Sequence, residues 1–325
     1  MKVARLHAAA AVQLHEETDP RPGPGEELVR VTAVGLCGSD RHWFNEGGIG
    51  DSVLTRPLVL GHEISGVIEG GSRSGERVAI DPAIPCGTCE SCTAGRAHLC
   101  PDIRFAGHGT TDGGLRTLMS WPGRLLASLP DAIGDDEGAL LEPLGVALHA
   151  ADLGKISHGM SAGVFGCGPI GVLLVQLLRL AGAQRIVATD PVPERLAAAR
   201  AMGATDAQFP LARPQSLDVV FEVAGSAEAV DDAVAAARPG GRVVLVGIPA
   251  SDATTFRAST ARRKGLTLLL SRRMRGTDLT RAIDLAAKAD VDLASLVSAR
   301  FSLDRTVEAF GSLSRYEGLK TIVRP

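Results

Sequence analysis

Residues 161–270 alternate between short apolar runs and segments with helical spacing, and this alternation limits the possible folds more than any other feature. The apolar runs are expected to be strands, because they are short and bounded by turn residues. The expected strands are 162–165, 185–189, 218–223, 242–246 and 266–270, and the expected helices are 170–181, 194–202 and 227–237. Strands that alternate with helices at this interval form a parallel sheet covered on both faces. The sequence therefore predicts a doubly wound α/β domain.

A glycine-rich turn, Gly166-Cys167-Gly168-Pro169-Ile170-Gly171, precedes the first of these helices. The pattern G-x-G-x-x-G is informative here because it follows a strand and opens a helix, with Asp190 19 residues beyond Gly171. Glycines let the backbone approach a pyrophosphate, and the helix N-terminus offers it free amide groups. An Asp190 carboxylate would accept hydrogen bonds from both ribose hydroxyls and repel a 2′-phosphate, which favours NAD over NADP. The alternative, that Asp190 only caps the next helix before Pro191, stays open.

The first 130 residues have a different character, with short strand-like segments separated by turns rich in glycine and proline. This pattern predicts a barrel-like β domain. At 325 residues the chain is too long for one ordinary core. We expect two domains, one formed by 1–148 and completed by 273–325, the other formed by 149–272. A helix is expected at 135–152 and another at 279–289.

Composition argues against several classes of function. A net charge of -3 gives no positive excess for binding nucleic acid or an anionic membrane surface. No apolar stretch reaches the length of a membrane span, since Gln176 and Arg179 interrupt the best candidate. The N-terminus also lacks the layout of a signal peptide, so we expect a cytoplasmic location.

Four cysteines follow the spacing C-x2-C-x2-C-x7-C, at Cys86, Cys89, Cys92 and Cys100. Two-residue gaps let sulfur atoms converge on one ion, and four thiolates complete a tetrahedral zinc site with no open position. An iron–sulfur cluster is the alternative because Pro101 follows the last cysteine, but ferredoxin motifs have shorter spacing before that cysteine. We therefore expect a structural zinc site, with His98 outside the ligand set.

A second group of possible metal ligands is spread along the first half of the chain, at Cys37, His62, Glu63 and Glu142, each near a glycine or proline. Catalytic zinc takes three protein ligands and leaves a fourth position for water or substrate. Spacing does not decide between Glu63 and Glu142 as the third ligand. Cys37 also opens a segment, Cys37-Gly38-Ser39-Asp40-Arg41-His42, that we interpret as a loop.

Taken together, these stretches resemble the zinc-dependent medium-chain dehydrogenases, and within them the sorbitol (L-iditol 2-) and xylitol dehydrogenases. The matching stretches are CGSDRHWFNEGGIGD (37–51), RPLVLGHEISG (56–66), EGALLEPLGVALHA (137–150), GCGPIG (166–171), VVLVGI (243–248) and GLKTIV (318–323). They occur in order along nearly the whole chain. The resemblance implies a GroES-like β-barrel catalytic domain and a Rossmann domain. It also implies one catalytic and one structural zinc ion per chain, and reversible oxidation of a polyol's secondary alcohol by NAD.

The resemblance further implies roles for single residues. Cys37, His62 and Glu63 would bind the catalytic zinc, with Glu142 contacting the zinc-bound water or replacing Glu63 as ligand. Ser39 and His42 would relay the substrate proton, and Asp40 would orient a metal-bound histidine. Positions that would contact the cofactor are Gly166, Gly168, Pro169, Ile170, Gly171, Asp190, Arg195, Val246 and Gly247. Trp43 and Arg272 would line the substrate pocket, and His108 lies in a glycine-rich turn that faces either the pocket or the surface.

Some positions depart from the family pattern. Trp43 and Arg273 stand where tyrosines are typical, which leaves the identity of the polyol open. Segment 208–216 is too short for the helix that usually precedes the fourth strand, so we expect an extended crossover. An L-threonine 3-dehydrogenase-like activity, another secondary-alcohol dehydrogenase and a non-catalytic, zinc-stabilised NAD-binding protein remain alternatives. The resemblance implies a homodimer or homotetramer.

Overall fold

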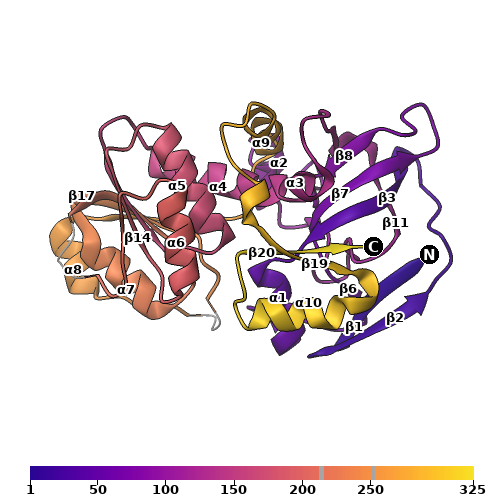
Figure 1. The fold of residues 1–325 in the computed structure, drawn as a ribbon, viewed down its shortest axis with the longest axis horizontal. Coiled ribbons are helices and arrows are strands. Elements are labelled where there is room, and N and C mark those ends of the chain that lie inside the picture. The colour runs from indigo at the N-terminus through magenta and orange to yellow at the C-terminus, as the bar shows by residue number, and fades with distance from the viewer. Residues whose placement is uncertain (212–215, 250–252) are drawn as a thin grey trace. The chain divides into compact units, whose positions relative to one another are not determined.

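A computed structural model describes residues 1–211, 216–249 and 253–325 and divides into two compact units (Figure 1). The first unit comprises Met1–Pro143 and Arg275–Pro325, and the second comprises Leu144–Met274. The chain therefore leaves the first unit, builds the second and returns. The domain bounds expected from the sequence, 1–148 with 273–325 and 149–272, stay a prediction. In the described ranges, no helix combines the length and the apolar character needed to cross a membrane.

The first unit is built on a seven-stranded sheet with the order β12-β8-β7-β3-β20-β19, in which β11 also pairs with β3. These strands are β3 (Glu26–Gly35), β7 (Glu63–Glu69), β8 (Arg77–Ile80), β11 (Leu118–Pro122), β12 (Leu126–Ser128), β19 (Val297–Ser302) and β20 (Lys320–Arg324). All pairs are antiparallel except β19 with β20. The predicted β-rich first domain is confirmed.

Smaller strands complete this unit. The N-terminal residues form a hairpin of β1 (Lys2–Ala8) and β2 (Ala11–Glu16), and β6 (Leu58–Val59) pairs with β1. The turn lies at Ala10, which has a φ of 57°. Two-stranded pairs are formed by β4 (Gly48–Ile49) with β5 (Ser52–Val53) and by β9 (Ala83–Ile84) with β10 (Arg104–Phe105).

Three strand ends meet at one place in the first unit. The last residue of β3, Gly35, lies opposite Glu63, the first residue of β7, and also opposite Ile322 of β20. The next backbone amide, that of Leu36, donates to the carbonyl of Thr321 at 2.9 Å. This pairing brings residues from three distant parts of the sequence together.

The segment after Leu36 is a helix, α1 (Gly38–Glu46), so the interpretation of this segment as a loop was wrong. Cys37 is its N-cap residue, and the Asp40 carboxylate accepts a hydrogen bond from the Cys37 amide at 3.0 Å, as in a capping box. Gly47 ends the helix in the left-handed conformation, with its amide bonded to the Trp43 carbonyl. Trp43 and Phe44 bury the helix against the core.

The single helix expected at 135–152 is two helices, α3 (Asp135–Ala139) and α4 (Leu141–Gly154). Glu142 lies in the first turn of α4.

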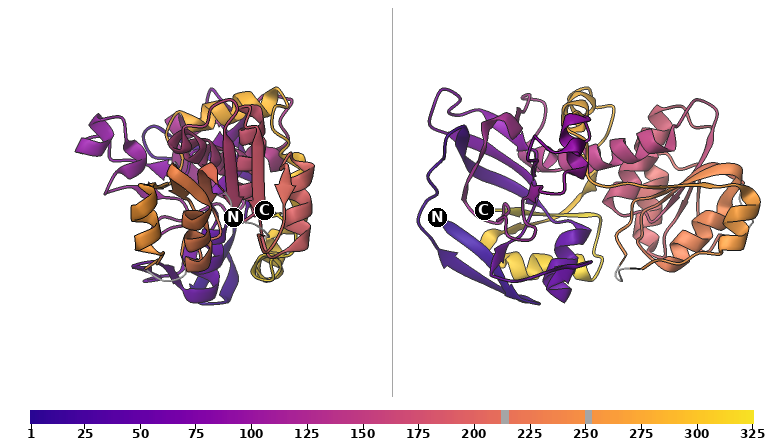
Figure 2. Two further views of the ribbon diagram at one scale, coloured as in Figure 1. Left: turned by 90° about the vertical axis from the view of Figure 1, so that its left-hand side faces the viewer. Right: turned by 180° about the vertical axis from the view of Figure 1, so that it is seen from behind.

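In the described part of the second unit, six parallel strands follow the order β15-β14-β13-β16-β17-β18. Numbered from the first strand of this unit, the order is 3-2-1-4-5-6, that of the Rossmann fold. The strands are β13 (Ser161–Phe165), β14 (Arg185–Thr189), β15 (Asp206–Ala207), β16 (Leu217–Glu222), β17 (Ala237–Leu245) and β18 (Thr267–Leu270). Helices α5 (Pro169–Leu180), α6 (Pro193–Ala201), α7 (Ala227–Ala236) and α8 (Ala258–Lys264) flank the sheet on both sides (Figure 2). The predicted doubly wound domain is confirmed, although residues 212–215 of the expected crossover lie outside the described residues.

The chain after Met274 returns to the first unit, as expected. It forms α9 (Asp278–Ala287), β19, α10 (Thr306–Ser314) and β20. Helix α10 was not predicted. Its Phe310 stacks on Phe44 of α1 with ring centroids 4.6 Å apart, so the returning segment forms part of the same core.

Candidate metal and dinucleotide sites

Cys37, His62 and Glu63 form one compact group of possible metal ligands. One ligand atom from each lies within 4.8 Å of the others. Cys37 caps α1, and His62 and Glu63 lie at the start of β7, so the meeting of strand ends described above creates the group. A thiolate, an imidazole and a carboxylate are a donor set that suits zinc. Glu142, the alternative third ligand, is outside this group.

Asp40 fixes the orientation of His62. The Asp40 carboxylate is fully buried and lies 3.3 Å from Nδ1 of His62, and it also accepts hydrogen bonds from the amides of Cys37 and Gly61. Burial alone would raise the pKa of Asp40, but attraction to His62 and these hydrogen bonds hold it below its usual value. Burial alone would lower the pKa of His62, but Asp40 raises it well above the usual value. A carboxylate at Nδ1 leaves Nε2 as the nitrogen for a metal ion.

Lys320 is a part of this site that sequence reasoning missed. Its Nζ lies 2.6 and 2.7 Å from the two carboxylate oxygens of Glu63 and donates to the Leu36 carbonyl at 3.1 Å. Both side chains are almost completely buried. Burial alone would lower the pKa of Lys320, but Glu63 and Cys37 keep it above its usual value. The signal in the sequence was a lysine at the start of an apolar strand, because lysine is rarely buried without a charged partner.

Glu142 is the other buried carboxylate near this group, with 5% of its surface exposed. Burial raises its pKa to about 7, with a further rise from Glu63 and opposing effects from His62 and Lys320. A carboxyl group with such a pKa can take up or release a proton at neutral pH.

Ser39 and His42 lie one turn apart on α1, so their side chains are on the same side of the helix. His42 is 6% exposed, and its Nδ1 lies 2.9 Å from the carboxylate of Glu46. The Glu46 side chain is 49% exposed. Ser39, His42 and Glu46 therefore follow one another from the first turn of α1 to the exposed Glu46 carboxylate. That Ser39 and His42 relay a proton stays a prediction.

The three proposed substrate residues are in different environments. Trp43 is 1% exposed and packs in the core of the first unit. Its Nε1 donates to Nδ1 of His108 at 3.2 Å, and the two rings meet edge to face. Trp43 therefore positions His108, which is half-buried, while Arg272 is exposed on the second unit. Their contact with a substrate stays a prediction.

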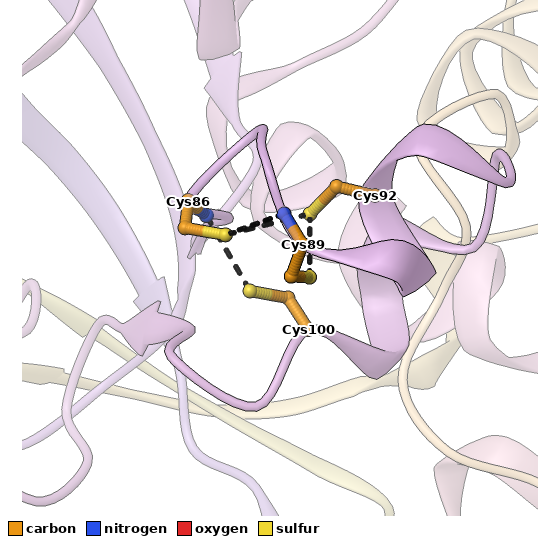
Figure 3. A group of neighbouring side chains, drawn as sticks. All are labelled: Cys86, Cys89, Cys92 and Cys100. Atoms are coloured by element: carbon orange, nitrogen blue, oxygen red, sulfur yellow. Dashed lines mark hydrogen bonds between the residues drawn. The ribbon is translucent and has the colours of Figure 1, made fainter.

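The other four cysteines form a second compact group (Figure 3). The sulfur of Cys92 lies 4.0 Å from that of Cys86 and 3.5 Å from that of Cys89. Bonds of about 2.3 Å to one tetrahedral zinc ion would place sulfurs about 3.8 Å apart, whereas a disulfide needs about 2.0 Å. The backbone amides of Thr88 and Cys89 lower the pKa of Cys86 to about 6. The group therefore fits a single metal ion held by thiolates.

The glycine-rich turn packs as a dinucleotide-binding loop does. A Cβ on Gly166 would lie 2.7 Å from the Ala224 amide nitrogen, and a Cβ on Gly171 only 1.9 Å from the Gly166 carbonyl oxygen. Both glycines are required by close packing. A Cβ on Gly168, by contrast, would meet only Nη1 of Arg195, at 3.9 Å. The backbone at Gly168 is therefore open for a pyrophosphate to approach, at the N-terminus of α5.

Asp190 holds this loop in place. Its Oδ2 accepts a hydrogen bond from the Cys167 amide at 2.7 Å, and its Oδ1 accepts one from the Val192 amide at 2.8 Å. Val192 is the N-cap residue of α6, so Asp190 does support the start of that helix. This local role does not prevent the carboxylate from also accepting bonds from ribose hydroxyls, since each oxygen has two lone pairs. Cys167 is fully buried.

Glu222, at the end of β16, is a second residue that sequence reasoning missed. Its Oε1 accepts hydrogen bonds from the amides of Ala224 and Gly225, at 2.8 and 2.7 Å. Its carbonyl oxygen accepts bonds from the amides of Val246 and Gly247, at 2.8 and 3.0 Å. Glu222 thus fixes the segment that contains two of the predicted cofactor positions. An acidic residue at the end of the apolar run Val219–Phe221 was the available signal.

Models of two protein families match the chain. The family described as "Alcohol dehydrogenase GroES-like domain" matches residues 23–131, and the one described as "Zinc-binding dehydrogenase" matches residues 169–288.

Known proteins are similar to the chain over most of its length. A sorbitol dehydrogenase from Bacillus subtilis is 32% identical, with 100% of this chain and 97% of that protein covered. A protein from Aspergillus fumigatus named "Probable D-xylulose reductase A" is 35% identical, with 92% and 89% covered. A Sinorhizobium meliloti protein solved with bound NADP has a TM-score of 0.91 and 32% identity, with 100% and 99% covered.

Proposed function

Because the chain belongs to the zinc-binding dehydrogenases with an alcohol dehydrogenase GroES-like domain, we propose that it oxidises a secondary alcohol of a polyol to the ketose, with NAD as hydride acceptor. The reverse reaction would reduce the ketose. As a member of this family the chain is an oxidoreductase. The polyol and the preference for NAD are the parts that the proposal adds.

One observation carries the proposal: Cys37, His62 and Glu63 form a compact group of three possible metal ligands, and Asp40 contacts the histidine. A non-catalytic, zinc-stabilised protein would not need this second set beside the four-cysteine group. A zinc ion at this set would polarise the alcohol oxygen as a Lewis acid, and NAD would accept the hydride.

The remaining steps belong to residues of the chain. Asp40 holds His62 with Nε2 toward the ligand group. The alcohol proton would pass to Ser39 and then to His42, whose ring nitrogen is hydrogen-bonded to the exposed Glu46. Glu142, with a pKa of about 7, would act as a second proton acceptor beside the ligands.

The second unit would bind the dinucleotide. The open backbone at Gly168 and the N-terminus of α5 support a pyrophosphate site there. The buried carboxylate of Asp190 follows β14, where it would accept bonds from the ribose and repel a 2′-phosphate. This supports NAD over NADP for this chain.

The names of the two relatives support a polyol and ketose pair as substrate and product, since one is a sorbitol dehydrogenase and the other is named for D-xylulose reduction. The four-cysteine group would hold a structural zinc ion that takes no part in catalysis, because four thiolates leave no open position.

The test is NADH formation with a panel of four- to six-carbon polyols, threonine and simple secondary alcohols, with bound zinc measured in the same preparations. We expect a polyol preference, a strong preference for NAD over NADP, and two zinc ions per chain. Cys37→Ser should lose one zinc ion and nearly all turnover, yet bind NADH as the wild type does. Full activity of Cys37→Ser would overturn the catalytic site, and a threonine preference would overturn the substrate class.

A further inference from the structure

We infer that a cavity of the first unit binds a small hydroxylated carboxylate, whose charge is received by the buried guanidinium of Arg116. The cavity has a volume of about 380 Å³, and sites for small molecules typically measure about 300–1,000 Å³. The residues that line it all lie between Glu26 and Trp121, and none of them belongs to either candidate metal group. The site is therefore independent of the proposed reaction.

The cavity and the Cys37 group lie on opposite sides of β10. Phe105 faces the candidate metal ligands, because its ring centroid lies 5.3 Å from that of His62. Neighbouring residues of a strand point to opposite faces, so Arg104 points away from His62, and it lines the cavity. From the paired strand β9, Ile84 adds an apolar part of the wall. A ligand in the cavity would thus leave the metal group free.

Arg116 is the lining residue that indicates a ligand. It is 9% exposed, and in the described part of the chain its buried Nε has no hydrogen-bond partner. Buried polar groups of native proteins are hydrogen-bonded with few exceptions. Burial lowers the pKa of Arg116, and attraction to Asp112 offsets only part of this effect. A guanidinium in this state at the wall of a cavity is suited to take its acceptor from a ligand.

The two carboxylates that attract Arg116 are already engaged by Arg5. Both oxygens of Asp112 lie 3.0 Å from the Arg5 guanidinium, and Oδ1 also accepts a hydrogen bond from the Val59 amide at 3.1 Å. Glu17 pairs with Arg5 through both of its oxygens, at 2.5 and 2.9 Å. Among the described residues, neither carboxylate is hydrogen-bonded to Arg116. The acceptor that Arg116 lacks must therefore come from outside this group.

The other walls of the cavity carry groups that suit hydroxyls. Thr110, Thr111 and Ser120 contribute hydroxyl groups. Glu26 contributes a carboxylate, and the hydrogen bonds that it receives from the Ser120 hydroxyl and a backbone amide both end on Oε2. Its Oε1 can accept a bond from a ligand hydroxyl. The exposed Arg104 adds a second cation at the edge of the cavity.

Geometry and charge favour a carboxylate as the anionic group. The N–H donors of a guanidinium form a planar fork that matches the two oxygens of a carboxylate. The charges around the cavity balance, with Arg5, Arg104 and Arg116 opposite Glu17, Glu26 and Asp112. A doubly charged phosphate would leave a larger uncompensated charge in this partly buried place than a singly charged carboxylate.

The experiment is calorimetric titration of the zinc protein with sodium gluconate, a hydroxy acid, at constant ionic strength. Sorbitol, which has the same carbon chain length without the carboxylate, and inorganic phosphate are titrated in parallel. We expect one gluconate per chain with a Kd on the order of 1 mM. Arg116→Gln should weaken binding by about tenfold or more, because it removes a charge-assisted pair of hydrogen bonds. Arg104→Gln, at the edge, should weaken it by about threefold.

Two controls place the ligand. Arg315→Gln alters an exposed arginine of the same unit that pairs with Glu317, and it should bind gluconate as the wild type does. Cys37→Ser should also bind gluconate normally, because the cavity is separate from the metal group. If Cys37→Ser loses gluconate binding, the ligand sits at the metal group, and the inference is overturned while the proposed function stands.

Other results would also overturn the inference. These are no binding of gluconate, equal binding by Arg116→Gln and the wild type, or tighter binding of phosphate than of gluconate. Sorbitol binding that depends on Arg116 would exclude a carboxylate as the required group. If sedimentation shows a smaller assembly for Arg116→Gln, a carboxylate of a second copy fills the cavity instead.

Arg104→Gln covers the case in which Arg116→Gln does not fold. Arg104 is exposed, so its replacement should leave the fold intact. A threefold loss of gluconate affinity in this variant, with normal affinity in Arg315→Gln, supports the cavity as the site. An unchanged affinity in Arg104→Gln overturns it.

Discussion

Asp40 combines two tasks that are usually given to different residues. It caps α1 through the Cys37 amide, and it holds His62 through Nδ1. Because Cys37 is itself in the ligand group, one carboxylate positions two of the three ligands. The same carboxylate therefore stabilises the first turn of α1 and holds two members of the ligand group.

Asp40→Asn tests this double role. The amide keeps the shape of the side chain but loses the charge that favours the metal-bound form of His62, so chelators should remove metal from this site about 10 to 100 times faster. The measurement is the release rate of one zinc ion per chain. Asp304→Asn, which alters an exposed carboxylate of the same unit, should leave the rate unchanged. An unaltered rate in Asp40→Asn would contradict the proposed orientation of His62.

Sequence reasoning at the residue scale found the groups with recognisable chemistry. The spacing of the four cysteines and the glycine-rich turn predicted local arrangements correctly, since short spacing fixes which atoms can meet. Lys320 was missed for the opposite reason: its contact with Glu63 spans 257 residues and depends on the pairing of β20 with β3. Spacing carries no information about such a contact.

At the scale of elements, the two halves of the chain differ in how well the sequence predicted them. The strands and helices of the second unit were found because apolar runs and helical spacing alternate regularly. In the first unit α1 was missed, since Gly38 and Ser39 at its start are typical of turns. The actual signals, an acidic residue at the third helical position and Gly47 after the last turn, are those of helix caps.

Asp218 links two neighbouring strands of the parallel sheet and gives a prediction about pH. Its carboxylate accepts hydrogen bonds from the Ser161 amide and hydroxyl, at 2.8 and 2.7 Å, and from Nε of Arg238 at 2.6 Å. The bonds from Ser161, with a smaller effect of Arg238, lower its pKa from 3.8 to about 2. Since the folded state holds this proton less tightly than the unfolded state, the stabilisation is complete above pH 3.8 and is lost as the pH falls through about 2.

Asp218→Asn should therefore lower the free energy of unfolding by about 1–2 kcal/mol at neutral pH, and the difference from the wild type should shrink at about pH 3. Urea unfolding at both pH values measures it. Asp206→Asn, in the same sheet, removes a looser pair with Arg185 at 3.8 Å and should cost less than about 0.5 kcal/mol. If the difference in the free energy of unfolding between Asp218→Asn and the wild type is the same at both pH values, the charge of Asp218 does not contribute to stability.

At the scale of the whole molecule, each unit carries its own candidate ligand sites. Both candidate metal groups lie in residues 1–143, and the glycine-rich loop, Asp190 and Glu222 lie in residues 144–274. The metal and dinucleotide should thus stabilise different parts of the chain.

Hydrogen exchange followed by mass spectrometry can measure this division. NADH at 100 times its Kd should slow exchange by up to about 100-fold, most strongly in peptides that cover 163–171 and 186–192. Removal of zinc by a chelator should speed exchange most in peptides that cover 36–63 and 86–100. Equal effects of either ligand on both units would contradict separate sites.

The long sequence interval between Glu63 and Lys320 has a consequence for how the protein matures. A ribosome adds Lys320 257 residues after Glu63, which takes on the order of 10 to 50 s at typical rates of synthesis. During this interval the Glu63 carboxylate lacks its counter-charge, and β20 is absent from the sheet. The group of Cys37, His62 and Glu63 therefore gains its buried counter-charge only after the whole second unit has been synthesised, so a nascent chain that stops between residues 100 and 320 carries both candidate metal groups but lacks Lys320.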